Sequence, residues 1–267
     1  MNKEHWQKTN KEHLQTLTDS ELASADQPES MVESYDGWRN PAAFIAADTF
    51  TLFGALGDVS GRAVLDLACG PGFTTRLLAM AGASPIVGVD FSEEIIALAR
   101  MQEAAQPLGI EYRVEDVTVL PILGSFELAT VVYLFNLTPA RASLAAMFRS
   151  IHANLAENGK LAAIVANAAP LSGADWEKFG LKIRERVAAD ETTLLKVDIL
   201  TEPPMPFEYY EWTREDLETA AYDAGFATVD WQPCRTPPPD DQFDEVFWGK
   251  YAEGPVSSLM TCTKRTV

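Results

Sequence analysis

Between residues 63 and 167, short apolar runs typical of strands alternate with longer segments of helical periodicity. Several of the runs are almost wholly apolar, so both faces of the sheet they form must be covered, which favours a parallel sheet between two layers of helices. Right-handed crossovers then predict a doubly wound α/β fold. The predicted strands occupy residues 63–68, 85–90, 110–116, 126–135 and 160–167, and helices are predicted at 73–82, 92–105 and 139–159.

The segments before and after this alternation have a different character. Residues 1–30 are polar and charged and are expected to form a peripheral arm. Residues 31–267 are expected to form one domain, with a buried helix at 42–56. Residues 168–211 break the rhythm with a helix-like piece at 174–189 followed by a stiff, proline-rich and aromatic stretch. We expect this insertion to lie above the strand ends as a lid.

The C-terminal part returns to the sheet. Thr213 is predicted to cap a helix, and Asp216 completes a capping-box pattern. Further strands are predicted at 226–233 and 257–265. Because a long connection joins these two strands, we expect them to pair as an antiparallel hairpin at one edge of the sheet.

Charge and cysteine content limit the possible partners. The net charge of −18 disfavours nucleic acid and anionic membranes as partners. The cysteines, Cys69, Cys234 and Cys262, form no CxxC pair, so neither a zinc site nor a disulfide framework is suggested and no metal is expected. The polar N-terminus and the lack of a run of membrane-spanning length predict a soluble protein of the cytoplasm.

The turn after the first predicted strand, in "VLDLACGPGFTTRLL", is the expected ligand site, because ligands of open α/β sheets bind beyond the carboxyl ends of the strands. Gly70, Gly72 and Thr75 come within one letter of the dinucleotide fingerprint, and Asp90 follows the first glycine by about twenty residues. Thr75 stands where that fingerprint has a glycine, however, and Asp66 would place negative charge near a pyrophosphate.

S-adenosylmethionine is the second ligand class that the turn suits. It has no phosphate, and its ammonium group, ribose diol and adenine amino group are all partners for acids. Asp66, Asp90 and Asp116 lie at the ends of three successive predicted strands. Asp66 is placed to hold the ammonium directly or through water, Asp90 the two ribose hydroxyls and Asp116 the adenine amino group.

At this point the chain resembles the class I S-adenosylmethionine-dependent methyltransferases. The resemblance rests on "VLDLACGPG", "VGVDFSEEIIALAR", "YRVEDV" and "LAENGKLAAIV", and covers residues 35–232. Ala68 replaces the first turn glycine of the family, and Asn158-Gly159 replaces its usual Gly-Gly. The stretches "VVYLFNLTPARASLAAMFRSI" and "FWGKYAEGPVSSLMTCTK" look like the small-molecule branch that includes toxoflavin-type methyltransferases.

The resemblance implies a mostly parallel seven-stranded sheet in the order 3-2-1-4-5-7-6, with the last strand antiparallel and the donor across the first four strand ends. Two sets of site residues are expected. The donor set comprises Tyr35, Asp66, Ala68, Cys69, Gly70, Gly72, Asp90, Phe91, Ile95, Asp116, Val117 and Tyr133. The acceptor set comprises Trp38, Asn136, Tyr209, Tyr210 and Trp212. Ordinary packing remains the alternative for the aromatic members of both sets and for Asn136.

The expected reaction is transfer of a methyl group from S-adenosylmethionine, with S-adenosylhomocysteine as product, to a nitrogen or oxygen of a small aromatic or apolar molecule. Alignment of donor and acceptor does most of this chemistry. No catalytic base is evident, because His5 and His13 lie in the polar arm and His152 is placed mid-helix. Two alternatives stay open: an NAD(P)-dependent oxidoreductase, and a catalytically silent S-adenosylmethionine-binding partner protein. The oligomeric state is not predicted.

Overall fold

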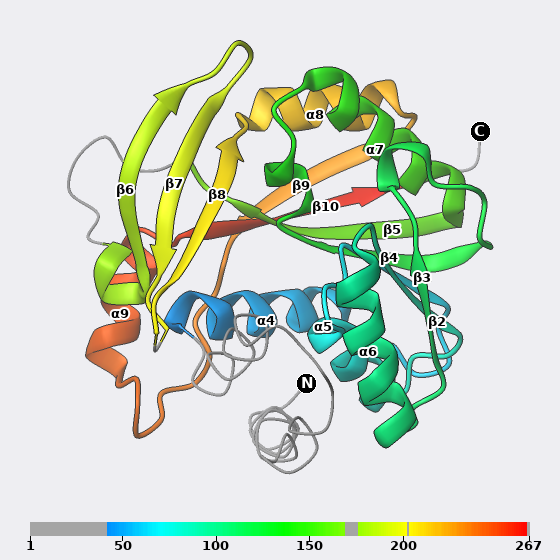
Figure 1. Cartoon of the computed structure of the whole chain (residues 1–267), viewed down its shortest axis with the longest axis horizontal. Coiled ribbons are helices and arrows are strands. Elements are labelled where there is room, and N and C mark those ends of the chain that lie inside the picture. The colour runs from blue at the N-terminus through cyan, green and yellow to red at the C-terminus, as the bar shows by residue number, and fades with distance from the viewer. Residues whose placement is uncertain (1–41, 169–175, 202, 266–267) are drawn as a thin grey trace.

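A seven-stranded sheet forms the centre of the computed structural model, which describes residues 42–168, 176–201 and 203–265 (Figure 1). The strand order is β3-β2-β1-β4-β5-β10-β9. Neighbouring strands from β3 to β5 are parallel, whereas β10 is antiparallel to both β5 and β9. This is the predicted order 3-2-1-4-5-7-6, with the hairpin at the edge. The strands are β1 (Val64–Leu67), β2 (Ile86–Asp90), β3 (Ile110–Val114), β4 (Phe126–Val132), β5 (Leu155–Ala166), β9 (Thr228–Pro233) and β10 (Ser257–Thr263).

Helices cover both faces of this sheet. The helices α4 (Ala43–Leu56), α5 (Phe73–Met80) and α6 (Glu93–Ala105) lie on one face, and α7 (Arg141–Asn154) and α8 (Arg214–Asp223) on the other (Figure 1). Successive strand residues point to opposite faces. Val64 therefore packs with α4 and α5, whereas Leu65 packs with α7 and α8. Apolar residues on both faces of one strand explain why the strands lack polar alternation.

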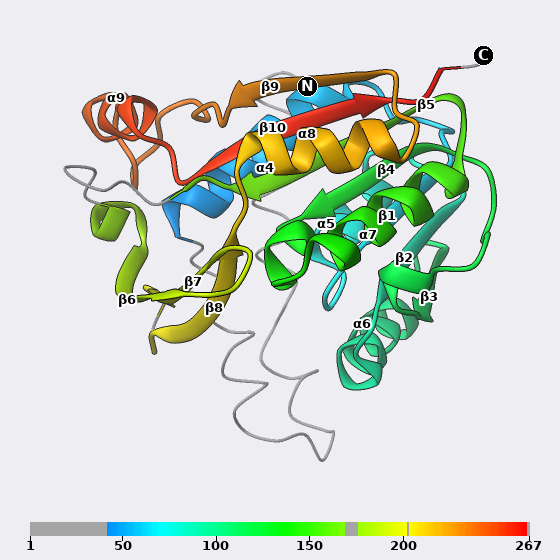
Figure 2. The ribbon, with the colours of Figure 1, turned by 90° about the horizontal axis from the view of Figure 1, so that it is seen from above.

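The insertion is a small antiparallel sheet, in the order β6-β7-β8. It consists of β6 (Leu181–Ala188), β7 (Thr193–Ile199) and β8 (Met205–Glu211), preceded by the 3-10 turn η4 (Trp176–Phe179). Figure 2 shows it beside one end of the main sheet, near α9 (Glu245–Glu253). The helix predicted over 174–189 is wrong for residues 181–188. The intervening Lys, Arg and Glu favour a helix. This preference is outweighed by pairing with β7 and by the apolar side chains of Leu181, Ile183 and Val187 on alternate positions.

Helix α7 also ends earlier than predicted. We expected it to run to Gly159, but it stops at Asn154, and Leu155 is already paired with Phe126 of β4. The buried Asn154 amide donates to the Pro121 and Ser150 carbonyls and accepts from the Leu123 N–H. These bonds join the helix end to the loop before β4. Helix α9, inside the connection predicted as a loop at 234–255, was missed.

Several predictions concern residues outside those described. The polar arm at 1–30, Tyr35 and Trp38 belong to this group, as do residues 174–175 of the predicted helical piece. Among the described residues, no helix combines the length and the apolar character needed to cross a bilayer.

The predicted capping box at α8 is confirmed and generates a stability prediction. The Thr213 hydroxyl accepts from the Asp216 N–H at 3.2 Å, and the Asp216 carboxylate accepts from the Thr213 N–H at 3.3 Å. We expect Thr213→Ala to lower the free energy of unfolding by about 1 kcal/mol in urea titrations. Thr213→Ser should keep most of the stability, since serine caps equally well. Equal losses for the two variants would contradict a capping role.

Candidate functional site

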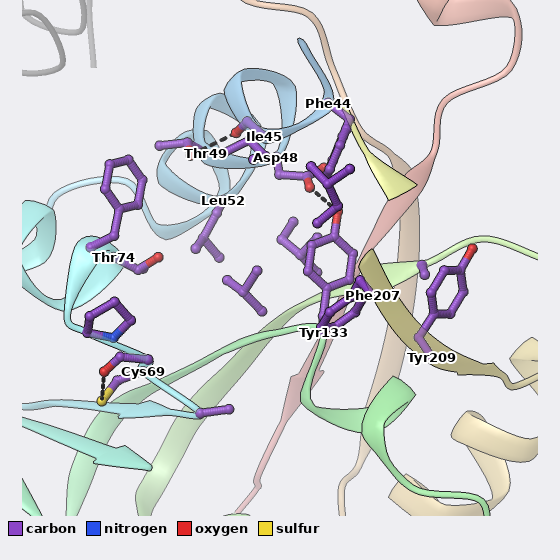
Figure 3. Close-up of a pocket in the computed structure, with 18 of the residues that line it drawn as sticks. Phe44, Ile45, Asp48, Thr49, Leu52, Cys69, Thr74, Tyr133, Phe207 and Tyr209 are labelled. Carbon is purple, nitrogen blue, oxygen red and sulfur yellow. Dashed lines mark hydrogen bonds between the residues drawn. The ribbon is translucent and has the colours of Figure 1, made fainter. Parts of the chain in front are cut away.

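A cavity of about 280 Å³ opens between α4, the glycine turn after β1, the end of β4 and the small sheet (Figure 3). Apolar and aromatic side chains make up most of its wall, and the polar groups are few. The lining includes Phe44, Ile45, Asp48, Thr49, Leu52 and Phe53 of α4; Ala68, Cys69, Gly70, Pro71, Phe73 and Thr74 of the turn and α5; Asp90, Gln102, Val132, Tyr133, Leu137, Ile164 and Ala166; and Leu181, Ile199, Met205, Phe207, Tyr209 and Val256.

The turn has the backbone conformation that its glycines predict. Gly70 and Gly72 have φ of 57° and 100°, and Ala68 has 53° in spite of its side chain. A Cβ on Gly72 would lie 2.3 Å from the Tyr112 hydroxyl, so this glycine lets Tyr112 cross beneath the turn. A Cβ on Gly70 would meet nothing within 4 Å. Gly70 therefore borders open space, while Gly72 serves packing and is not part of the cavity wall.

Asp90 ends β2 and joins the turn to the next strand. One of its carboxylate oxygens accepts from the Gly70 N–H at 3.0 Å, and the other accepts from the Ser92 N–H at 3.1 Å. The side chain lines the cavity. A carboxylate offers about four lone-pair sites. Asp90 thus retains acceptor capacity for a ligand after holding the turn.

Asp66 was expected at the end of the first strand, where it could hold an ammonium group. It is instead an interior residue of β1 and lies beneath the turn. Only 1% of its surface is exposed, and its two oxygens accept from the Thr75 and Thr130 hydroxyls at 2.6 and 2.7 Å. The structure does not bring this carboxylate into the cavity wall. Burial raises the pKa of Asp66 to about 6, against the lowering effect of the threonine hydrogen bonds.

Four donor-set residues, Phe91, Ile95, Asp116 and Val117, lie outside the cavity wall and follow the ends of β2 and β3 in the chain. Asp116 lies two positions after β3 and accepts from the Thr118 N–H at 2.8 Å, so it caps the short turn η2 (Val117–Val119). Its neighbour Val117 is buried in the core, Ile95 is half-buried, and Phe91 is 72% exposed. The structure therefore leaves Asp116 and Phe91 accessible at the strand ends and assigns Val117 to packing. Cys69 is in the cavity wall, where burial raises the pKa of its thiol.

Sequence reasoning missed Asp48, a buried acid of α4 in the cavity wall. The hydroxyls of Tyr133 and Ser257 both donate to its carboxylate, and Figure 3 shows Tyr133 and Asp48 pointing toward each other. Burial raises the pKa of Asp48 to about 6, although hydrogen bonds from Ser257 and Tyr133 lower it. One signal was present in the sequence: Asp48 is the single charged residue in the apolar helix at 42–56. A buried charge needs a compensating partner or a function.

Two of the predicted acceptor residues, Tyr209 and Tyr210, lie on opposite faces of β8, and Trp212 directly follows this strand. Tyr209 lines the cavity with Met205 and Phe207, because alternate residues of a strand share a face. Tyr210 and Trp212 are not in the cavity wall. The Trp212 indole N–H donates to the Thr138 carbonyl at 3.1 Å, and its ring packs in the main core.

Asn136 also differs from its prediction as an acceptor-binding residue. It is wholly buried in the short turn η3 (Leu134–Leu137). Its amide donates to the Tyr210 carbonyl at 2.9 Å and accepts from the Ala166 N–H at 3.1 Å. Asn136 thus fastens the small sheet to β5. Tyr133, which precedes η3 with φ of 62°, and Leu137 at the end of η3 are the residues of this segment that line the cavity.

Sequence comparisons find a family match for the part of the chain that contains the glycine turn. Residues 64–159 match the family described as methyltransferase domain. A demethylmenaquinone methyltransferase of Lactococcus lactis is 32% identical over 139 residues, which are 49% of this chain and 51% of that protein. A ubiquinone biosynthesis O-methyltransferase of Bordetella pertussis is 30% identical over 90 residues, 33% of this chain and 37% of that protein. The chain thus spans about half, or less than half, of the length of these relatives.

Solved structures share the fold over most of the chain. An S-adenosylmethionine-dependent methyltransferase from Clostridium acetobutylicum has a TM-score of 0.62 at 17% identity, covering 89% of this chain and 98% of that one. A 1,6-didemethyltoxoflavin-N1-methyltransferase from Burkholderia thailandensis, solved with 1,6-didemethyltoxoflavin and S-adenosylhomocysteine, has a TM-score of 0.56 at 18% identity, with coverages of 100% and 92%. The Rossmann-like methyltransferase fold expected from the motifs is confirmed.

Burial of Asp66 predicts a pH-dependent stability. Its pKa is raised from the usual value of 3.8 to about 6, so the native state binds the proton more tightly than the unfolded chain. Stability from this group should therefore be greatest below about pH 4 and fall as pH rises through about 6, by at most about 3 kcal/mol. We expect Asp66→Asn to reduce the pH dependence of urea unfolding over this range, leaving the part due to Asp48, and the exposed Asp241→Asn to leave it unchanged. Parallel curves for wild type and Asp66→Asn would contradict the assignment.

Proposed function

Because residues 64–159 match the methyltransferase domain family, we propose that the chain is an S-adenosylmethionine-dependent methyltransferase of small molecules. The observation that carries the proposal is a single cavity with two unlike ends. One end is the glycine turn with the Asp90 carboxylate, and the other is a mainly apolar wall from α4 and the small sheet. Methyl transfer needs a donor and an acceptor side by side, away from water.

The residues of the turn fit the donor. Open space beside Gly70 leaves room for a ligand close to the backbone, and the spare acceptor capacity of Asp90 suits a ribose diol. We propose that Asp116 and Phe91, accessible at the neighbouring strand ends, contact the adenine. When bound, the donor supplies a methyl group on a positively charged sulfur. The chain's own contribution is to orient the partners and to exclude water.

The second end of the cavity favours an apolar or aromatic acceptor. Its wall includes Phe44, Leu52 and Phe207, with Tyr209 at the small sheet. Aromatic side chains offer a large contact area at low cost in conformational entropy. We propose that the methyl group goes to a nitrogen or an oxygen of such a molecule. Relatives and neighbours named for O-methylation and for N-methylation agree with either choice.

Binding measurements test the proposal against its two alternatives. Calorimetry with S-adenosylmethionine and S-adenosylhomocysteine should give binding, and NADH should give none. Preference for NADH would point to an oxidoreductase. Binding of S-adenosylmethionine without turnover of any acceptor would point to a silent partner protein. Formation of S-adenosylhomocysteine together with a methylated acceptor is the result that supports the proposed enzyme.

Removal of the Asp90 carboxylate should weaken donor binding. Asp90→Ala loses the contacts to the diol and the bond that holds the Gly70 N–H. Because hydrogen bonds to charged groups contribute about 1.5–3 kcal/mol each, we expect more than a tenfold loss of S-adenosylhomocysteine affinity by calorimetry. The circular dichroism spectrum should stay that of the wild type. Unchanged affinity would remove Asp90 from the donor site.

The two faces of β8 offer a matched test of the acceptor site. Tyr209→Ala and Phe207→Ala should impair methyl transfer, because they open the apolar wall of the cavity. Affinity for S-adenosylhomocysteine should stay within about threefold, a change below 1 kcal/mol. Tyr210→Ala is the control, since Tyr210 is next in sequence but is not part of that wall. If Tyr210→Ala lost as much turnover as Tyr209→Ala, the acceptor would not lie at this face.

A further inference from the structure

Asp48 is an anomaly in the wall of the cavity. Only 4% of its surface is exposed, and it is the one charged residue of a mainly apolar helix. Its carboxylate receives two hydroxyl hydrogen bonds but forms no ion pair with any residue in the described ranges 42–168, 176–201 and 203–265. Burial of a carboxylate without a cation is costly, and a wall that only had to hold an apolar acceptor would not need it.

We propose that Asp48 is the general base that takes the proton from the methyl acceptor, and that Tyr133 and Ser257 are the positioning residues that hold it. This inference rests on the proposed function and refines its substrate class. The acceptor would be an apolar molecule whose nucleophilic atom carries a hydroxyl or amine proton at neutral pH. An acceptor that is already ionised would not need Asp48.

The hydrogen bonds leave Asp48 able to act. Tyr133 donates to one carboxylate oxygen and Ser257 to the other, and the Cys234 thiol is a third hydrogen-bond partner, which leaves about one of four lone-pair sites for an acceptor. The residue lines the same cavity as the glycine turn, so an acceptor bound beside the donor can reach it. A hydrogen bond to each oxygen fixes the carboxylate in place, as a positioned base requires.

The surroundings of Asp48 set its pKa close to neutral pH, because burial raises the pKa and hydrogen bonds lower it. The titratable side chains that act on it are Tyr133 at the end of β4, Cys234 after β9 and Tyr251 of α9, and Ser257 of β10 is its polar neighbour. The Ser257 hydroxyl also contacts the Cys234 sulfur at 3.4 Å. Burial raises the pKa of Asp48 to about 6, so the carboxylate is mostly ionised at pH 7 yet binds a proton more readily than an exposed aspartate.

The step is balanced without a further reactant. The acceptor's lone pair forms a bond to the methyl carbon, and the carbon–sulfur bond breaks with its electron pair on sulfur, which becomes the neutral thioether. The acceptor's proton passes to a carboxylate oxygen of Asp48. The proton leaves to solvent when the products depart, which restores the carboxylate.

The test uses three probes that share an aromatic body: 1-naphthol, the more acidic 4-nitro-1-naphthol, and 1-methylnaphthalene, which has no acidic proton. Their binding to the protein saturated with S-adenosylhomocysteine is measured by calorimetry in two buffers of different ionisation enthalpy. Initial rates of S-adenosylhomocysteine formation from S-adenosylmethionine are measured against pH. The proteins are wild type, Asp48→Asn, Tyr133→Phe, Ser257→Ala and the exposed control Asp241→Asn.

We expect 1-naphthol to bind the wild type more tightly than 1-methylnaphthalene and to be methylated. Asp48→Asn should lower its turnover about 100-fold or more, the range of general-base catalysis, and reduce turnover of 4-nitro-1-naphthol much less. Tyr133→Phe and Ser257→Ala remove hydrogen bonds that lower the pKa of Asp48, so the acidic limb of the rate profile should move to higher pH. Asp241→Asn should match the wild type in every measurement.

Other results overturn the proposal. If Asp48→Asn lost donor affinity and thermal stability but kept the ratio of rates for the two naphthols, Asp48 would be structural. If the acidic limb did not move in Tyr133→Phe and Ser257→Ala, the titrating base would be another group. If neither naphthol bound or reacted while S-adenosylhomocysteine still bound, the acceptor class would be wrong and the donor site would stand. If the wild type did not bind S-adenosylhomocysteine at all, the proposed function itself would be contradicted.

Discussion

The position of the glycine turn depends on one buried carboxylate. Asp66 of β1 accepts from Thr75 of α5 and from Thr130 of β4, so it joins a strand, the helix that follows the turn and the neighbouring strand. Because an unsatisfied buried carboxylate is very costly, these three elements must keep their relative positions. The turn between β1 and α5 is thereby held above the sheet, and Asp90 then fastens Gly70 to the end of β2.

The opposite wall of the cavity is held by packing between distant segments. Helix α4, the small sheet and α9 share one apolar cluster that includes Phe44, Phe179, Tyr209 and Tyr251. Asn136 adds polar bonds from η3 to β8 and β5. The small sheet therefore has fixed contacts with the main one, and the cavity between them has one wall from each. This division agrees with the proposal that the donor lies at the strand ends and that the acceptor lies against the small sheet.

Much of the fold was predictable because it rests on short-range patterns. Apolar runs at 63–68 and 85–90, glycines with positive φ and the Thr213–Asp216 capping box all act between neighbours in the chain. Errors arose where distant contacts prevail over local preference. Pairing with β7 makes a strand of residues 181–188, and pairing of Leu155 with Phe126 ends α7 early. The pleat of β8 separates Tyr209 from Tyr210, which sequence alone left as equal candidates.

The sequence by itself therefore determined the doubly wound sheet, the strand order through its family resemblance, and the glycine turn beyond the end of β1, which Asp90 holds through Gly70. Only the tertiary structure decided which acids line the cavity: Asp48 and Asp90 do, and Asp66 does not. Asp66 is buried and hydrogen-bonded to Thr75 beneath the turn. Asp48 is brought into contact with Tyr133 and Ser257, which lie 85 and 209 positions away in the chain. Periodicity and motif spacing report the local backbone, whereas the partner of a buried side chain follows from the register and packing of elements that are distant in sequence.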